Sequence, residues 1–245
     1  MGRAFEYRKA TKLKRWGHMA KTFTRLGKQI AIAVKAGGPD PDMNPALRSV
    51  IAVCKRENMP KDNIDRAIKN AQGKDQSNYE TRTYEGYGPH GIAVLVEAAT
   101  DNNNRTVANV RSYFTKAGGS LGTAGSVEYM FDRKSMFRFK STKPYDLEEL
   151  ELELIDYGVD EIFEEEDEDE NKEIVVYGEF TAFNQIQEYI EDNGFELISG
   201  EFTRLPNTDL KDLDPESRAK IEKLIDNIEE DEDVQNVYTN LKPAE

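Results

Sequence analysis

Basic side chains that repeat with the period of a helix are the first residues of this chain whose types and spacing suggest chemistry. At roughly 100° per residue, four of them share an arc of about 80°, opposite an apolar stripe that includes Leu26 and Ile30. Such cations neutralise the phosphates of a nucleic acid and release counterions, which gives affinity without reading base sequence. We therefore expect one helix flank to bind phosphates through Lys21, Arg25, Lys28 and Lys35.

The segment before this helix mixes basic and aromatic residues without a clear period. Aromatic rings among cations, such as Tyr7 and Trp16, stack on unpaired bases. An ordinary solvated surface is the alternative interpretation. No helix-turn-helix or zinc-finger spacing is present, so specificity for a duplex sequence is not implied. The predicted contacts of this segment are Arg8, Lys9, Lys12, Lys14, Arg15 and Trp16.

The net charge of −14 conceals an uneven distribution. Residues 1–75 contain 17 Lys+Arg and 7 Asp+Glu, a balance of +10, whereas residues 76–245 contain 16 and 40, a balance of −24. In the first 39 residues, Glu6 is the only acid against ten Lys+Arg. This asymmetry points to an N-terminal region that faces nucleic acid. Docking of the basic region on the acidic remainder of the chain is the alternative.

Two loops are further candidates for ligand contacts. The Asp101–Arg105 turn could bind through Asn102, Asn104 and an exposed Arg105, or its Asn and Asp residues could simply cap the following helix. The glycine-rich stretch 118–125, with Gly118 and Gly119 at its start, could wrap phosphates with backbone amides. It lacks the Gly-Lys-Ser/Thr ending of a P-loop and follows a predicted helix, which favours a helix end with a tight turn.

The counts of cysteine and histidine restrict the remaining chemistry. A single cysteine, Cys54, excludes an internal disulfide and predicts a reducing compartment, the cytoplasm. His18 and His90 are too few for a Cys/His zinc site or a spare catalytic histidine. The acidic run Glu164–Glu170 lacks the spacing of a calcium loop. No apolar run reaches the ~18 residues of a membrane helix. We expect no catalysis, no metal, no cofactor and no membrane contact.

The elements that must position these residues change in character after Gly73. Three short amphipathic helices predict a small helical domain over residues 21–73, and the following pattern of strands and helices predicts an α+β fold. A β-α-β-β-α-β order over residues 133–200, with a net charge of −15, is typical of a ferredoxin-like sandwich. The tail lacks partners of its own, so we expect it to complete the sheet begun at residues 82–131. Outside residues 133–200, the predicted strands are Arg82–Glu85, Gly91–Ala98, Ser126–Phe131, Glu201–Leu205 and Val234–Thr239, and the predicted helices are Arg105–Lys116 and Pro215–Ile228.

The fold prediction is therefore an N-terminal helical bundle and two ferredoxin-like α/β domains, the middle one discontinuous. The predicted limits are 1–80 for a basic helical domain, 81–132 with 201–245 for the discontinuous domain, and 133–200 for an acidic domain.

Several motifs along residues 21–131 resemble the YebC/PmpR family, whose mitochondrial relative is the translational activator of cytochrome c oxidase. The matching runs include Asn44-Pro45-Ala46-Leu47-Arg48, Asn58-Met59-Pro60-Lys61-Asp62-Asn63-Ile64, Glu85-Gly86-Tyr87-Gly88-Pro89, Asn104-Arg105-Thr106 and Gly125-Ser126-Val127. The resemblance implies three domains, the middle one closed by the C-terminus, and no catalysis. Members are usually described as DNA-binding transcriptional regulators, and some are linked to the ribosome and to translation of proline-rich stretches.

The chain departs from the family pattern at two places. The family commonly opens with Gly-His-Ser-Lys-Trp, where this chain has Gly2-Arg3-Ala4-Phe5-Glu6, and Trp16-Gly17-His18 follows later. His90 replaces a glycine of the family's Gly-Pro-Gly-Gly turn. Three hypotheses stay open: a DNA-binding transcriptional regulator, a translation factor bound to ribosomal or transfer RNA, and an adaptor whose acidic domains bind a basic protein partner.

Overall fold

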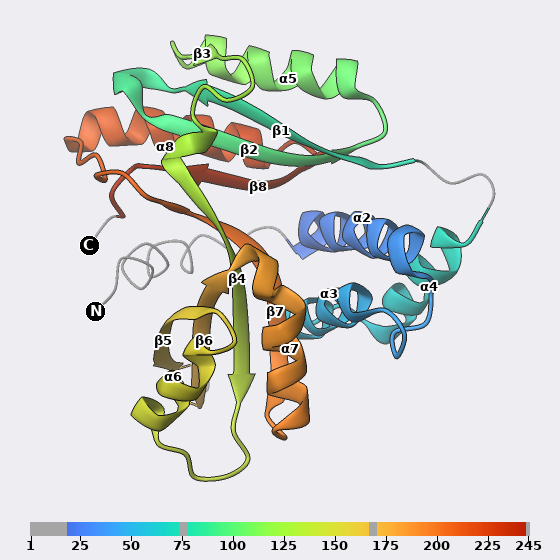
Figure 1. The fold of residues 1–245 in the computed structure, drawn as a ribbon. Helices are drawn as coiled ribbons and strands as arrows, with labels where there is room; N and C mark the ends of the chain where they lie inside the picture. Colours follow the sequence, from blue (N-terminus) through green and yellow to red (C-terminus); the bar gives the residue numbers. More distant parts are fainter. Residues whose placement is uncertain (1–18, 74–77, 167–170, 244–245) are drawn as a thin grey trace. The chain divides into compact units, whose positions relative to one another are not determined.

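The computed structural model describes residues 19–73, 78–166 and 171–243 (Figure 1). The chain divides into two compact units. The sheet-A unit contains the described residues of Met1–Ile32, Gly73–Asp132 and Leu205–Glu245, and the sheet-B unit contains those of Ala33–Gln72 and Arg133–Arg204. The predicted α+β class is confirmed, since N-terminal helices accompany two four-stranded antiparallel sheets.

Within residues 19–73, the N-terminal part that the structure describes, three helices form where the apolar periodicity predicts them. They are α2 (Met19–Gly37), α3 (Pro45–Arg56) and α4 (Lys61–Ala71). Asn44 determines where α3 begins, because its side-chain oxygen accepts the N–H of Leu47 at 3.1 Å and Pro45 occupies the first turn. The same side chain donates to the carbonyls of Ala33 and Gly38 at 2.9 Å, so one amide holds the end of α2 beside the start of α3.

Sheet A has the strand order β3-β1-β2-β8. The C-terminal strand β8 pairs antiparallel with β2, so that Val94 lies opposite Thr239. This pairing confirms that the tail completes the sheet begun before residue 132. The elements of this unit are β1 (Glu80–Tyr87), η2 (Pro89–Gly91), β2 (Ala93–Thr100), α5 (Asn103–Lys116), β3 (Ser120–Leu121), η3 (Glu128–Met130), α8 (Pro215–Glu229) and β8 (Val234–Thr239).

Helices α5 and α8 cover the same face of sheet A, as Figure 1 shows. Phe114 of α5 and Leu224 of α8 pack with Val94 and Val96 of β2, all completely buried. Strand β2 has apolar residues on both faces, as expected for a central strand. Its other face packs against Val127 and against further residues of a smaller core, namely Phe131 and Tyr238.

Sheet B has the order β5-β6-β4-β7, which is the ferredoxin-like order predicted from the β-α-β-β-α-β pattern. Phe137 and Phe139 of its central strand β4 are fully buried under helices α6 and α7. The elements are β4 (Phe131–Lys140), α6 (Leu147–Ile155), β5 (Val159–Glu166), β6 (Lys172–Glu179), η4 (Phe180–Ala182), α7 (Phe183–Asp192) and β7 (Glu196–Pro206).

Helix α3 packs within the sheet-B unit through polar side chains. Ser49 donates to the side chain of Gln187 on α7 at 2.8 Å, and Arg48 forms a bidentate ion pair with Glu191. The compact units therefore follow a different division from the predicted domains, because α3 and α4 group with sheet B. The predicted limits 1–80, 81–132 with 201–245, and 133–200 stay a prediction.

Two predicted strands differ from the structure. Ser126–Phe131 is not a strand: residues 128–130 form a 3₁₀ turn, and β4 begins only at Phe131. The N–H groups of Val127 and Glu128 are bound by the carboxylate of Glu85, so they are unavailable to a sheet ladder. Glu201–Leu205 is not a separate strand but the second half of β7.

Candidate nucleic-acid interface

The basic flank of α2 lies against the chain's own sheet-A unit. Arg25 donates to the backbone carbonyl of Gln235 at 3.2 Å, and Lys21 stands 3.8 Å from Glu230. Lys28 is only 7% exposed, and its ammonium lies 2.8 Å from a carboxylate oxygen of Asp233. The prediction that these cations share one flank fits this geometry, but the prediction that the flank is open to solvent is wrong at Lys28.

Asp233 is the centre of a buried charge network. Its carboxylate accepts hydrogen bonds from Lys28 at 2.8 Å, Arg105 at 2.7 Å and Thr106 at 2.7 Å, with Thr100 at 3.2 Å. Burial raises the pKa of this carboxyl, but the hydrogen bonds and the charge of Lys28 outweigh burial and hold the pKa at about 2. The network connects α2, the end of β2, the start of α5 and the start of β8.

This arrangement removes Lys28 from the predicted set of phosphate contacts. An ammonium whose donors already meet a carboxylate and two backbone carbonyls cannot also hold a phosphate without breaking the network. Lys21 and Arg25 are half-buried and Lys35 is exposed, so these three remain reachable from solvent. The predicted contacts Arg8, Lys9, Lys12, Lys14, Arg15 and Trp16 lie outside the described residues.

The turn before α5 has the capping role that the sequence left open. The side-chain oxygen of Asn102 accepts the N–H of Arg105 at 3.1 Å, which closes the first turn of the helix. The guanidinium of Arg105 is exposed but ion-paired with Asp101 at 3.0 Å and with Asp233 at 2.7 Å. Asn104 is exposed on the same turn. Of the predicted loop contacts, only Asn104 has a side chain that the described hydrogen bonds leave unused.

The glycine-rich stretch ends a helix and does not form an open cradle. The N–H of Gly118 bonds to Thr115 and the N–H of Gly119 to Phe114, which is how a helix closes at a glycine with positive φ. Further along, the carboxylate of Glu85 accepts three backbone N–H groups at 2.7 to 2.8 Å, from Gly125, Val127 and Glu128. The amides do surround an anion, but that anion is the chain's own glutamate.

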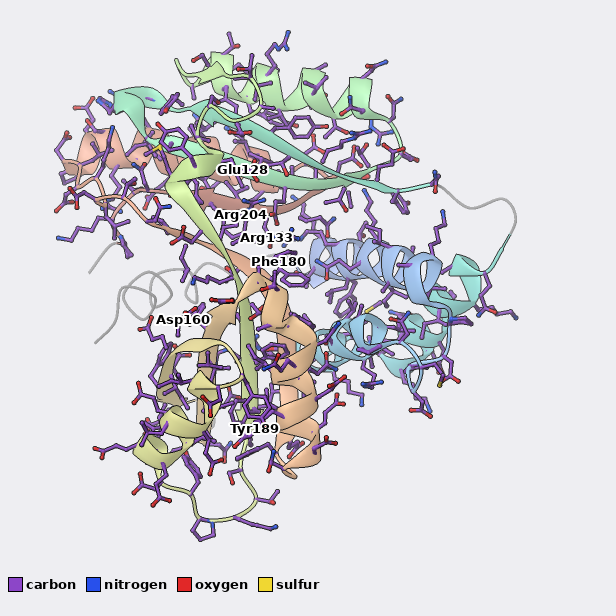
Figure 2. The ribbon with its side chains drawn as sticks, viewed as in Figure 1. Glu128, Arg133, Asp160, Phe180, Tyr189 and Arg204 are labelled. Carbon is purple, nitrogen blue, oxygen red and sulfur yellow. The ribbon has the colours of Figure 1, made fainter. Side chains whose placement is uncertain are left out.

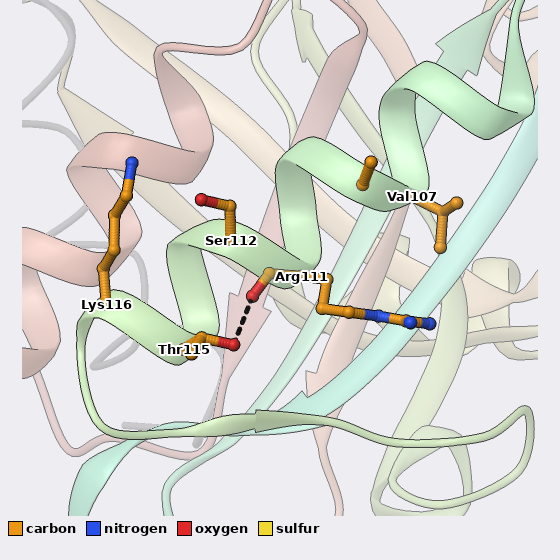
Figure 3. Close-up of a pocket in the computed structure, with 6 residues that line it drawn as sticks. Val107, Arg111, Ser112, Thr115 and Lys116 are labelled. Atoms are coloured by element: carbon orange, nitrogen blue, oxygen red, sulfur yellow. Dashed lines mark hydrogen bonds between the residues drawn. The ribbon is translucent and has the colours of Figure 1, made fainter.

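The outward face of α5 presents two cations that the sequence prediction did not include, Arg111 and Lys116. They lie at the edges of a shallow hollow of about 400 Å³, whose other lining residues are Val107, Ala108, Ser112 and Thr115 (Figure 3). Neither cation has an ion-pair partner among the residues that the structure describes. The sequence signal that identifies this face is the absence of acids: no Asp or Glu occurs between Asp101 and Glu128.

Arg133 of the sheet-B unit is a third exposed cation, and its partners are aromatic. Its guanidinium lies 3.8 Å from the ring centre of Phe180 and 5.1 Å from that of Phe202 (Figure 2). Both rings are partly exposed, at 36% and 39%.

Other kinds of site find little support in the described part of the chain. The thiol of Cys54 is buried, and burial raises its pKa to about 12, so the thiolate needed for nucleophilic chemistry is disfavoured. No group of three His, Cys, Asp or Glu side chains is placed to hold a metal among residues 19–73, 78–166 and 171–243. In the same ranges, no helix has the length and hydropathy required to cross a bilayer.

Comparison with known proteins decides the family. The model of the TACO1/YebC N-terminal domain matches residues 3–74, and the model of the second and third domains of the same family matches residues 79–241. The chain belongs to the TACO1/YebC family. The two matches together cover nearly the whole chain, which agrees with the resemblance seen in its motifs.

Bacterial relatives of this family are similar along their full length. A protein of Bacteroides fragilis is 67% identical over 245 residues, covering 100% of this chain and 98% of the relative. One from Porphyromonas gingivalis is 60% identical, covering 100% and 99%. Both are named probable transcriptional regulatory proteins. The crystal structure of a conserved hypothetical protein from Aquifex aeolicus is similar with a TM-score of 0.76 and 35% identity, covering 95% of this chain and 94% of that one.

Proposed function

We propose that this chain is a non-enzymatic regulator of gene expression that binds the phosphate backbone of DNA through its basic N-terminal region, in the cytoplasm. The observation that supports this proposal most strongly is the charge distribution, with ten Lys+Arg and a single acid in the first 39 residues of a chain whose net charge is −14. Cations concentrated in this way neutralise phosphates in spite of a net negative charge, because screening confines each charge to about 10 Å.

The contacts that we assign to this region exclude Lys28. They are Arg8, Lys9, Lys12, Lys14, Arg15, Trp16, Lys21, Arg25 and Lys35. Contacts of this kind position a protein on the backbone without selecting bases. Relatives with high identity are named as transcriptional regulators, which favours DNA as the target.

RNA on the ribosome is the second candidate target. Tyr7 and Trp16 stand among the N-terminal cations, an arrangement suited to unpaired bases, and no groove-reading motif accompanies them.

The test measures binding of the full chain to a short DNA duplex and to an RNA hairpin by fluorescence anisotropy over a range of salt concentrations. We expect the affinity to fall steeply, on the order of 10³-fold between about 50 and 200 mM salt if six or more phosphates are contacted. The triple variant Arg8→Glu, Lys9→Glu, Lys12→Glu should lose most of this affinity.

The matched control reverses three lysines far from the N-terminal segment in sequence, Lys143→Glu, Lys172→Glu and Lys223→Glu. Equal loss in both triple variants would mean that only overall charge matters. If neither nucleic acid binds while a basic protein partner does, the adaptor hypothesis replaces this proposal.

A further inference from the structure

The longest stretch without acids in the second part of the chain coincides with one helix and its flanking turns. Residues 76–245 contain 40 Asp+Glu, yet residues 102–127 contain none. Their three cations all belong to α5: Arg105, Arg111 and Lys116. A helix surface free of carboxylates in so acidic a chain would create a local positive potential, since neighbouring acids are what normally cancel surface lysines and arginines.

The outward face of α5 consists of a strip of small side chains with a cation on either side. At about 100° per residue, Ala108 and Thr115 share one direction, whereas Arg111 and Lys116 point about 140° apart. Figure 3 shows the two cations leaving the helix on opposite sides of the hollow. The hollow is lined by Val107 and Ala108 beside two hydroxyl side chains, and the hydroxyl of Thr115 donates to the carbonyl of Arg111 at 2.9 Å.

Two side chains of α5 bind an acid of the sheet-A unit. Asp231 accepts hydrogen bonds from Asn109 at 2.9 Å and from Tyr113 at 3.1 Å, so its carboxylate is already engaged. Arg105 is ion-paired with Asp101 and Asp233. Arg111 and Lys116 thus keep their charges unneutralised by any described carboxylate, and both are exposed.

We propose that the outward face of α5 is a second contact for the backbone of a DNA duplex, with one strand lying along Ala108, Ser112 and Thr115 and its phosphates bound by Arg111 and Lys116. The two cations are five residues apart, about 7.5 Å along the helix axis, so they can bind different phosphates of one strand. Two exposed cations on a helix surface free of carboxylates suit a regular row of negative charges, such as the phosphates of one strand. The inference rests on the proposed function.

The first experiment compares the full chain with the variant Arg111→Glu, Lys116→Glu in the same duplex titration. We expect an affinity loss of at least about tenfold and a salt slope reduced by about 2, because each lost phosphate contact removes about 0.9 from the slope. The control is Lys220→Glu, Lys223→Glu on α8, which makes the same charge change on the other helix of the same sheet face. It should change the affinity much less. The milder pair Arg111→Gln, Lys116→Gln replaces the first variant if thermal melting shows misfolding.

Failure of this inference differs from failure of the proposed function. If the α5 variant binds the duplex as well as the unaltered chain while the N-terminal triple variant does not, the α5 contact is refuted and the regulator proposal stands. If the unaltered chain binds neither duplex nor RNA, both are refuted.

A second measurement tests position independently of affinity. Ser112→Cys, labelled with a photoreactive group, should crosslink to the duplex, whereas Lys223→Cys with the same label should not. The native Cys54 is buried and does not compete for the label. Equal crosslinking from both positions, or none from Ser112→Cys, would refute the α5 contact.

Discussion

Asp233 shows how a single carboxylate can stabilise residues far apart in sequence. It binds Lys28, which lies 205 residues away, and Arg105, which lies 128 residues away. A buried charge is tolerated only when it is paired, and removing one member of such a pair leaves the other uncompensated, at a cost of about 3–5 kcal/mol. The network therefore links α2 and α5 to the start of β8.

Replacing Asp233 should destabilise the sheet-A unit strongly. For Asp233→Asn we expect the free energy of unfolding to fall by about 3 kcal/mol, because Lys28 would stay buried without a countercharge. Urea unfolding at neutral pH measures the effect. Asp209→Asn, at an exposed carboxyl, is the control and should change stability by less than about 0.5 kcal/mol. A loss of similar size in both variants would contradict the role given to the network.

The same carboxyl predicts an acid-dependent loss of stability. Its pKa is held at about 2, below the ordinary 3.8, so the stabilisation is fully present above pH 3.8 and disappears as the pH falls toward 2. The pH-dependent part amounts to roughly 2 kcal/mol. Unfolding of the unaltered chain and of Asp233→Asn, compared from about pH 5 downward, should give stabilities that converge as the pH falls. A difference that stays constant over this range would contradict the assignment.

His90 occupies a backbone conformation that costs free energy for any residue with a Cβ. Its φ is +61° in the Gly88–Gly91 turn, and the left-handed region costs such residues roughly 1 kcal/mol. We expect His90→Gly to raise the melting temperature by a few degrees, corresponding to about 0.5–1 kcal/mol. His90→Ala keeps the strain and should give no gain, so equal stabilisation by both substitutions would show that the side chain, and not the backbone, is responsible.

At the scale of elements, Glu85 of β1 organises the chain between β3 and β4. It holds three N–H groups that would otherwise be unsatisfied in a loop. Glu85→Gln replaces one acceptor oxygen by a donor, and we expect a loss of about 2 kcal/mol together with faster amide exchange at Gly125, Val127 and Glu128. Glu80→Gln, at an exposed position of the same strand, is the control. Unchanged exchange at the three amides would contradict this role.

The strands and helices were predictable where local pattern and packing agree. Val234–Thr239 is a strand with the predicted limits, and α5 and α8 differ from the predicted Arg105–Lys116 and Pro215–Ile228 by at most two residues at one end. The prediction of a strand at Ser126–Phe131 was wrong because the side chain of Glu85, 42 to 43 residues earlier on another strand, binds the N–H groups of Val127 and Glu128. A contact of that kind leaves no trace in the local sequence.

The candidate site was predictable only in part, for a similar reason. Helical spacing places Lys21, Arg25 and Lys28 on one flank but does not reveal what lies against it, and Asp233 is one of 47 acids with no local mark. The sequence pattern predicted a helix at Arg105–Lys116, which is α5. Its outward face was not predictable as a candidate site, because two separated cations form no motif and only the absence of acids around them is informative.

At the scale of the whole molecule, the sheet-A unit is assembled from both ends of the second part of the chain. If the chain is ended after Asp233, β2 loses β8, one of its two neighbouring strands, and the core loses Val234 and Leu241. We expect the amides of β2 to lose protection from hydrogen exchange, while those of β6 in the sheet-B unit keep it. Protection of β2 that survives the truncation would show that β1 and the helices suffice.

The pairing of β2 with β8 also has a consequence for biosynthesis. Val94 can pair with Thr239 only after the ribosome has added about 145 further residues. At a synthesis rate of about 5–20 residues per second this takes roughly 7 to 30 s. During that interval the strands of sheet B and helices α6 and α7 can emerge and fold. Meanwhile β2 has an unpaired edge rich in valine and alanine, which is exposed to any neighbouring nascent chain. Slow translation of the intervening codons would lengthen this exposure. The risk of aggregation through β2 ends only when β8, the last strand to be synthesised, pairs with it.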